Sequence, residues 1–437
     1  MGCPSFAIHA RHLPVELISL ILGEADKPTL AECTLVCRSW LELSRPFLFE
    51  SIVYRPHYPR YPQQYGDVPH PLEGLADFMI SRPDIGIRVR HLSLSLEKAK
   101  WTLLTVEDRA GVVALEPCRW QTLVALLHQL PRLRTLDLEN FLLEPLGPPH
   151  DARPLSAEPR FAALEALTFS RQCRAQDTGG CLGDVLHLLS LFARVDRLAL
   201  GAFFSPPADH AALAARIHTD VRALAVHAHA SPLLAGLPAL PGWAHLERLA
   251  LPLLPPADVP HALRLVNAAR AHLRAVELRV PHIEDRGATV RGLRVLALAN
   301  CPRLEELVLA LPFYGAGNLL VAGAGAVAGG RPYFTVAGYE YVTSLLAACP
   351  PVLRRITINL ELDLTPHECR QHVQPHTLQM DWSVLDDVLA GRVENGLDIV
   401  EFRHGPIEGV HGLSGEIQAY FAQKMPRLWE TNIAHFV

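Results

Sequence analysis

The 437-residue chain lacks the features that mark several large functional classes. Its nine cysteines include no C-x-x-C pair, and its basic residues, almost all arginine, form no run. No stretch approaches the roughly 18 uninterrupted apolar residues of a membrane span. The net charge is −5 and the pI is near 6.5, which argues against binding of nucleic acid through a basic face. We therefore expect no nucleic-acid or membrane partner, and reduced, mostly buried thiols in an intracellular protein of the cytoplasm or nucleus.

Motifs for catalysis and metal binding are missing too. The 22 histidines include no H-E-x-x-H, no G-x-S-x-G is present, and the glycine-rich stretch at residues 323–329 lacks the Lys-Ser/Thr of a phosphate-binding loop. The acidic pairs Asp386-Asp387 and Glu305-Glu306 are expected on exposed faces of helix or strand. Because no nucleophile, base and orienting group come together, we predict no enzyme activity, no cofactor and no metal site.

The most informative stretch, Leu13–Ile52, has the pattern of two or three short helices. Pro14 suits the first turn of a helix, where its missing N–H costs little. Thr29 and Glu32 predict a capping box at the start of a second helix. Apolar residues recur at helical spacing in both segments: Leu17, Ile18, Ile21 and Leu22, then Leu30, Cys33, Cys37 and Trp40. A module of about 40 residues is marginal alone, so its apolar side chains need cover from the next domain or from a partner.

The same stretch resembles an F-box, the short helical module that binds a Skp-type adaptor of cullin–RING ubiquitin ligases. The resemblance is carried by Leu13-Pro14-x-Glu16-Leu17-Ile18, Ile21-Leu22 and Val36-Cys37-Arg38-x-Trp40. Two departures are Ala25, where a large apolar residue is usual, and Phe47-Leu48-Phe49 in place of Leu-Trp. The resemblance implies that adaptor binding, or the core of the module itself, uses Leu13, Pro14, Leu17, Ile18, Ile21, Leu22, Val36, Cys37 and Trp40. The alternative is a helical cap on a larger domain.

A repeat follows a Pro- and Tyr-rich linker or strap at residues 53–71. The frame L-x-x-L-x-L, with Val, Ile or Phe allowed, starts at Val89, Leu133, Leu164, Val195, Val221, Leu246, Leu273, Leu304, Leu353 and Leu397. The central starts are 25 to 31 residues apart, close to the period of leucine-rich repeats. Each frame predicts a short strand.

Helical patterns precede many of these strands, namely Leu72–Ile80, Trp120–Leu130, Leu182–Phe192, Val259–Arg270, Tyr339–Ala348 and Trp382–Leu389. Repeated strand–helix units of this kind stack into a solenoid with a parallel sheet. The phrases at residues 130–138 and 301–309 make the region similar to the irregular leucine-rich repeats often found after an F-box. A non-repeating α/β domain is the alternative. We expect an insertion at residues 312–333 and a Pro-rich loop at 144–160, while Leu293–Ala299 fits a strand or a helix.

The fold class predicted is therefore α/β, with an N-terminal helical module at residues 9–52 and a leucine-rich-repeat-like solenoid at 72–437. In each frame the residues between the leucines point away from the core. They are Ser93, Asp137, Thr168, Ala199, Ala225, Ala250, Glu277, Val308, Thr357 and Glu401, followed by Ser95, Glu139, Ser170, His227, Arg279, Asn359 and Arg403. We expect this face to bind a protein client, with Asp137, Glu139, Glu277, Arg279 and Arg403 as its charged contacts. The alternative is a solvated surface without a partner.

The resemblance implies a non-catalytic substrate receptor of an SCF-type cullin–RING ubiquitin ligase, which joins a Skp-type adaptor, and through it a cullin, to a protein client. One alternative is a leucine-rich scaffold outside any ligase, which adaptor binding would distinguish. Another is an enzyme of an unrecognised α/β class, which would require a polar catalytic cluster. The sequence does not identify the client.

Overall fold

The computed structural model describes residues 13–55, 71–95, 119–139, 161–170, 188–201, 218–227, 241–251, 259–279, 298–314, 336–363, 382–404 and 413–436, together with residues 186, 234 and 237. The chain divides into two compact units, so each unit is described by itself. The described residues of the first end at 170, and those of the second begin at 186. No helix among the described residues is long and apolar enough to cross a membrane.

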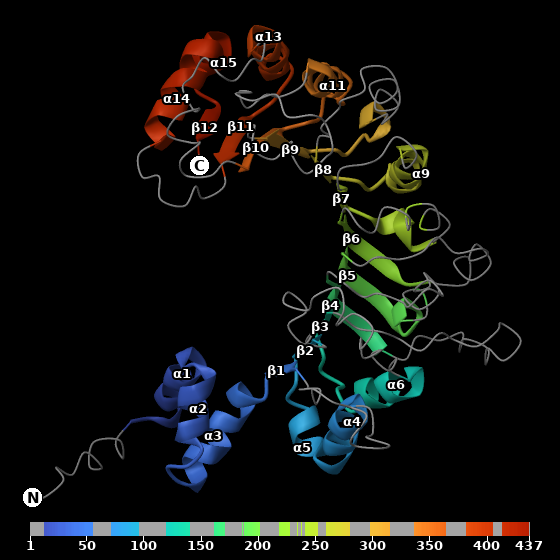
Figure 1. Cartoon of the computed structure of the whole chain (residues 1–437), viewed down its shortest axis with the longest axis vertical. Coiled ribbons are helices and arrows are strands. Elements are labelled where there is room, and N and C mark those ends of the chain that lie inside the picture. The colour runs from blue at the N-terminus through green and yellow to red at the C-terminus, as the bar shows by residue number, and fades with distance from the viewer. Residues whose placement is uncertain are drawn as a thin grey trace, which may run out of the picture. The chain divides into compact units, whose positions relative to one another are not determined.

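The first unit contains the N-terminal helices and four strands (Figure 1). Its elements are α1 (Val15–Glu24), α2 (Lys27–Cys33), α3 (Arg38–Leu48), β1 (Ser51–Tyr54), α4 (Pro71–Ser81), α5 (Pro83–Gly86), β2 (His91–Ser95), α6 (Trp120–His128), β3 (Thr135–Glu139) and β4 (Phe161–Phe169). The strands pair in parallel in the order β1-β2-β3-β4.

The second unit contains eight strands among its described residues, paired in parallel in sequence order. Its elements are β5 (Phe192–Leu200), β6 (Asp220–Val226), η8 (Pro241–His245), β7 (Arg248–Leu251), α9 (Val259–Ala269), β8 (Ala275–Arg279), η9 (Leu298–Asn300), β9 (Glu306–Tyr314), α11 (Val336–Ala347), β10 (Arg355–Asp363), α13 (Trp382–Val393), β11 (Ile399–His404), α14 (Leu413–Lys424), α15 (Pro426–Glu430) and β12 (Ala434–Phe436).

The ten sequence frames correspond to strands β2 to β11, so the predicted α/β architecture with parallel strands is confirmed. Two strands were not predicted. β1 pairs with β2, and β12 pairs with β11. Both are short, at four and three residues, which leaves too few positions for a period of two to be recognised. β1 also takes Val53 and Tyr54 out of the expected linker, of which residues 56–70 lie outside the described part.

The core forms where the leucines of successive frames meet. All three apolar positions of each frame are buried, except Leu133, which is half-buried. Helices supply the opposing layer, for example through Leu123 and Leu126 of α6 and Leu265 of α9. This burial is what the period-two pattern predicts for strands with one covered face. The largest fully buried side chain is that of Trp243 in η8, whose Nε1–H donates to the carbonyl oxygen of Leu237.

A ladder of charged residues occupies the second position of every frame. In the second unit its members alternate in sign from strand to strand: Asp196, Arg222, Glu247, Arg274, Glu305, Arg354 and Asp398. Arg222 lies 3.8 Å from Asp196, and Arg354 lies 3.5 Å from Asp398. Each exposed pair contributes at most about 1 kcal/mol. A one-residue slip of a strand would break these pairings and turn its leucines outward, so the ladder supports the observed register.

Several expected boundaries need correction. The insertion expected from residue 312 begins later, because Pro312–Tyr314 still belong to β9 and pair with Glu361–Asp363 of β10. Pro312 is tolerated there because the pairing of β9 with β8 already ends at Ala310. Phe192 starts β5 and is not part of the preceding helix. The rest of the insertion, the loop at 144–160 and most of Leu293–Ala299 fall outside the described residues.

Asp386 contradicts the expectation that the acidic pair is exposed. Its side chain is buried, and its two carboxylate oxygens accept hydrogen bonds from the backbone N–H groups of Arg427 at 3.0 Å and Leu428 at 2.7 Å. These N–H groups belong to the first turn of α15, which has no partner for them within the helix. Asp386 of α13 therefore caps a later helix, whereas Asp387 is exposed and pairs with the guanidinium of Arg427.

The described cysteines are free thiols with different surroundings. Cys301 and Cys349 are buried, whereas Cys37 is exposed and Cys33 is intermediate. Burial raises the pKa of Cys301 to about 11 and that of Cys349 to about 12, because a thiolate is poorly solvated in an apolar interior. These two thiols remain protonated and unreactive near neutral pH.

Candidate functional site

The first helix, α1, presents apolar side chains on two faces. Helical geometry of 100° per residue places Leu17, Leu20 and Ile21 on one side, and Ile18 and Leu22 on the other. The first group is exposed, whereas Leu22 is only 1% exposed and Ile18 is intermediate. The apolar residues of α1 predicted from the sequence thus form two groups, one exposed to solvent and one packed toward the core of the module.

Local hydrogen bonds fix where the first two helices begin. Pro14 precedes α1 and its carbonyl oxygen accepts from the N–H groups of Leu17 and Ile18 at 3.0 and 3.2 Å. The predicted capping box of Thr29 and Glu32 is wrong. Asp26 caps α2, accepting from the Thr29 N–H at 3.0 Å. The pKa of the Asp26 carboxyl is lowered, first by a hydrogen bond with the Thr29 side chain and second by this backbone bond. The helix starts earlier because Asp is a good cap and Pro28 needs no N–H partner.

The turn between α2 and α3 exposes a second apolar group. The Leu35 N–H donates to the Glu32 carbonyl oxygen at 2.9 Å, and the Val36 N–H donates to that of Cys33 at 3.3 Å. These bonds hold the turn, yet the side chains of Leu35 and Val36 are 85% and 64% exposed. Cys37, which precedes α3, is exposed as well. A well-ordered turn therefore displays apolar side chains to solvent.

The core of the helical module is small. Leu22 and Leu30 are buried, and Ser44 of α3 is buried with its hydroxyl donating to the Trp40 carbonyl oxygen at 2.6 Å. Trp40 itself is intermediate in burial. Leu22 therefore has the second of its two expected roles, a place in the core of the module, because its side chain has almost no exposed area. Leu13, Pro14, Leu17, Ile21, Val36 and Cys37 are all exposed, and Ile18 and Trp40 lie between the two environments.

Polar contacts hold the helices against the first strand. The ammonium of Lys27 donates to the carbonyl oxygens of Phe47 at 3.3 Å and Ser51 at 2.8 Å, and also to that of Leu48. Burial lowers the pKa of Lys27, an effect that the charge of Glu50 partly opposes. Glu50 in turn accepts from Arg90 at 2.9 Å. The end of α3 and the start of β1 are thus tied to α2 and to the residue that precedes β2.

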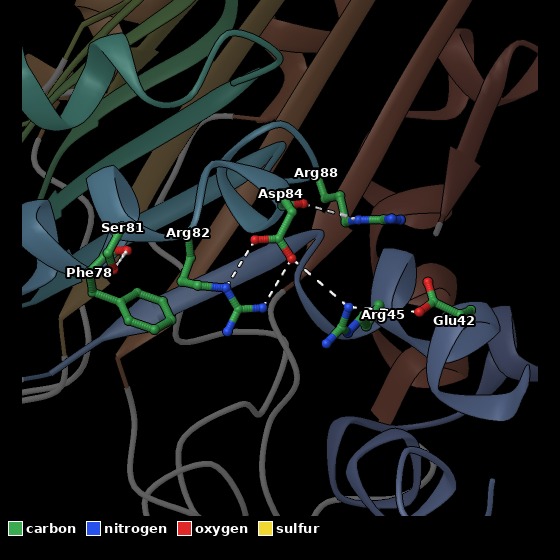
Figure 2. Close-up of polar contacts among 7 residues, drawn as sticks. All are labelled: Glu42, Arg45, Phe78, Ser81, Arg82, Asp84 and Arg88. Atoms are coloured by element: carbon green, nitrogen blue, oxygen red, sulfur yellow. Dashed lines mark hydrogen bonds and ion pairs between the residues drawn. The ribbon is translucent and has the colours of Figure 1, made fainter. Parts of the chain in front are cut away.

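Figure 2 shows a second connection, between α3 and α5. Arg45 of α3 lies 3.9 Å from an Asp84 carboxylate oxygen, while Arg82 donates to both oxygens of the same carboxylate at 3.0 Å. The hydrogen bond from Arg82 is the main reason that the pKa of Asp84 is lowered. Arg88 also donates to the Asp84 backbone oxygen at 3.2 Å. These exposed contacts are individually weak, but they join the helical module to the rest of the first unit.

Residues 10–55 match the F-box-like family. No curated protein matches the chain. The matched residues include all of α1, α2, α3 and β1, so the F-box-like domain extends beyond the three helices into the first strand. The domain indicates a role in binding the adaptor of an SCF-type ubiquitin ligase, and F-box proteins are generally non-catalytic substrate adaptors.

The outward face of the parallel strands is the other predicted site, and the register of these strands is as expected. In the first unit Asp137 lies between Ser93 and Thr168, and Glu139 lies opposite Ser95. In the second unit the outward row runs Ala199, Ala225, Ala250, Glu277, Val308, Thr357 and Glu401. The small apolar residues of this row are therefore its first three, on strands β5 to β7.

The five charged residues of this prediction fall in both units. Asp137 and Glu139 are half-buried on β3, whereas Glu277 and Arg279 of β8 and Arg403 of β11 are exposed. Arg403 donates to Glu401 at 2.5 Å. Two outward residues depart from expectation. Ser95 of β2 is only 5% exposed, and Thr357 is only 1% exposed between Val308 and Glu401. Among the described residues the Thr357 hydroxyl has no hydrogen-bond partner. The face is thus less open at β2 and β10 than the sequence pattern predicts.

Proposed function

We propose that this chain is a non-catalytic substrate receptor of an SCF-type cullin–RING ubiquitin ligase. Its F-box-like domain binds a Skp-type adaptor, which connects it to a cullin, and its parallel strands form a leucine-rich-repeat-like solenoid that binds a protein client. The exposed apolar edge of α1 within the F-box-like domain carries the proposal. Burying a side chain such as Leu17 or Ile21 against a partner is favourable by about 1.5–3 kcal/mol.

The surface of the F-box-like domain differs from the other described surfaces. Thirteen large apolar residues are exposed in the described part of the chain, and seven of them lie between residues 13 and 36. They are Leu13, Val15, Leu17, Leu20, Ile21, Leu35 and Val36. Such a concentration of exposed apolar area is typical of an interaction surface. It supports an adaptor partner over a helical cap, whose apolar residues would be covered by the same chain.

We expect the double variant Leu17→Glu/Ile21→Glu to lose adaptor binding by about 100-fold or more, since two carboxylates would have to be buried in the interface. The full chain is co-expressed with a Skp-type adaptor, a 1:1 complex is sought by size-exclusion chromatography with light scattering, and affinity is measured by calorimetry. Val352→Glu/Val384→Glu, which introduces the same two charges at exposed apolar positions outside the F-box-like domain, is the matched control.

Both changed side chains of α1 are exposed, so the variants should keep their helices. Circular dichroism checks this. A well-folded wild-type chain that forms no complex with the adaptor would contradict the proposal. That result would leave the alternative of a repeat scaffold that acts outside any ubiquitin ligase.

The client surface is tested separately. We expect Asp137→Lys/Glu139→Lys to retain the adaptor but to lose proteins that co-purify with the wild-type complex, because the charge of the β3 face is reversed. Quantitative mass spectrometry of affinity-purified complexes measures this loss. The control Asp77→Lys/Glu340→Lys makes the same change in net charge at exposed helical positions. An unchanged set of co-purifying proteins would argue against a client contact at β3.

A further inference from the structure

Two exposed arginines of the second unit lie on the outward face of neighbouring strands (Figure 1). Arg197 precedes the buried Leu198 of β5, and Arg248 precedes the buried Leu249 of β7. Successive side chains of a strand point to opposite faces, so both arginines point away from the core. Both are aligned with Ala223 of β6, which lies between them. Neither arginine belongs to the outward positions predicted from the sequence.

The charges of Arg197 and Arg248 are not neutralised within the described part of the chain, where neither side chain forms an ion pair. Asp196 directly precedes Arg197, but its two carboxylate oxygens accept from the guanidinium of Arg194 at 2.7 and 3.1 Å. Glu247 directly precedes Arg248 and is half-buried, yet it forms no ion pair with it. Two exposed guanidinium groups are therefore left to bind an external acid.

The residues around the two arginines leave space for a ligand. Ala199, Ala225 and Ala250 form the next outward row, and Ala275 of β8 is aligned with Arg248. Each of these side chains is a methyl group, so a second chain can lie close to the strands. Methyl groups specify no ligand by themselves, and the chemistry of the site is determined by the arginines.

The spacing of the arginines suits an extended chain that crosses the strands. Two strand spacings of about 4.8 Å place Arg197 and Arg248 about 10 Å apart. In a polyproline II segment, residues three apart share a face and lie about 9 Å apart. Carboxylates at these positions can each meet one guanidinium in the bidentate geometry that arginine favours. Glu277, which is exposed and continues the alanine row on β8, would repel such a segment and limits the site to β5–β7.

We propose that the outward face of β5 to β7 binds an acidic, extended segment of a client protein, whose carboxylates pair with Arg197 and Arg248. This inference rests on the proposed function, because it names the chemistry of the client that the repeat region receives. Charge complementarity assigns the occupant. The whole chain has a net charge of −5, so its overall charge repels an acidic segment and the attraction comes from the local arginines.

The test measures binding of a fluorescent peptide, Glu-Pro-Pro repeated four times, to the full-length chain by fluorescence anisotropy. A peptide with Gln in place of Glu has the same backbone without the carboxylates. We expect wild type to bind the Glu peptide about 10-fold or more tightly than the Gln peptide, and this preference to fall as salt is raised. Arg197→Glu/Arg248→Glu should weaken binding of the Glu peptide by about 10-fold or more, because each attraction becomes a repulsion.

The matched control is Arg270→Glu/Arg303→Glu. It makes the same change in net charge at exposed residues in the turns before β8 and β9, outside the outward face, and should bind the Glu peptide nearly as well as wild type. Circular dichroism checks folding of each variant. If the glutamate variant does not fold, Arg197→Gln/Arg248→Gln takes its place, with a smaller expected loss of affinity.

Three results would overturn the inference. They are a wild-type chain that does not bind the Glu peptide, equal affinity for the Glu and Gln peptides, and equal weakening by the control variant. Adaptor binding is measured on the same preparations. Loss of the adaptor complex with peptide binding intact would overturn the ligase function but not the acidic-segment site, whereas an adaptor complex that ignores the Glu peptide would overturn only this inference.

Discussion

Replacing Asp386 by alanine is expected to destabilise the second unit by about 2–4 kcal/mol. The buried carboxylate accepts from the N–H groups of Arg427 and Leu428, and hydrogen bonds to a charged group contribute about 1.5–3 kcal/mol. Its removal would leave both donors of α15 without a partner and open a small cavity beside Leu385 and Leu389 of α13. The last helix and β12 should then open together, because α15 connects α14 to the final strand.

Asp387→Ala is the matched control for this prediction. Its carboxylate is 61% exposed and pairs with Arg427 at the surface, so its loss should change stability by no more than about 0.5 kcal/mol. Asp386→Asn keeps one acceptor oxygen and should be intermediate. The chain has two units, so urea midpoints are compared and hydrogen exchange is followed in peptides covering residues 413–436. Similar midpoints for Asp386→Ala and Asp387→Ala would show that the buried carboxylate is not a structural cap.

Gly242→Ala is expected to be the most disruptive single methyl addition among the described glycines. An added Cβ at Gly242 would lie 1.9 Å from the Thr219 carbonyl oxygen and 3.0 Å from its carbonyl carbon. Both atoms are backbone, so no side-chain rotation relieves the contact. The chain would have to shift η8 away from the start of β6. This shift would also displace Trp243 of η8, which is fully buried. Overpacking of this kind costs about 1–3 kcal/mol, and more where backbone must move.

Gly391→Ala provides the control for Gly242→Ala. An added Cβ at Gly391 of α13 meets nothing within 4 Å, and alanine favours a helix over glycine by about 1 kcal/mol. Gly391→Ala should therefore raise the thermal midpoint of unfolding by a small amount, whereas Gly242→Ala should lower it by several degrees. Differential scanning calorimetry of the two variants beside wild type tests both directions. A Gly242→Ala variant as stable as wild type would mean that η8 and β6 are not in close contact.

The strand pattern was the part of the fold that residues alone could predict. A leucine at each inward position is required by local geometry, since alternate side chains of a strand point to opposite faces. This requirement repeats in every frame, so even the modified frames such as Val89-Leu92-Leu94 and Leu353-Ile356-Ile358 were placed correctly. The charged second position was visible in the sequence as well. The alternation of sign produces ion pairs only because of the order in which the strands pair, which places Arg354 beside Asp398.

The roles of individual polar residues could not be predicted from the sequence pattern. Asp386 and Asp387 are adjacent and chemically identical, yet one is buried under α15 and the other is exposed. The difference depends on a segment 40 residues later in the chain, which no local pattern contains. Likewise Thr29 and Asp26 are both suitable caps, and the choice between them depends on where the chain leaves α1.

The sequence by itself therefore determined which segments form strands β2 to β11, which side of each of these strands is apolar, and that most of residues 13–52 form helices with more apolar residues than they can bury. These properties follow from the period of each element and from composition. Only the tertiary structure decided which apolar residues of α1 remain exposed, which charges meet, and how α3 is joined to β1 and α5. These are results of packing between distant segments, and packing is set by the whole set of neighbours that each side chain acquires on folding.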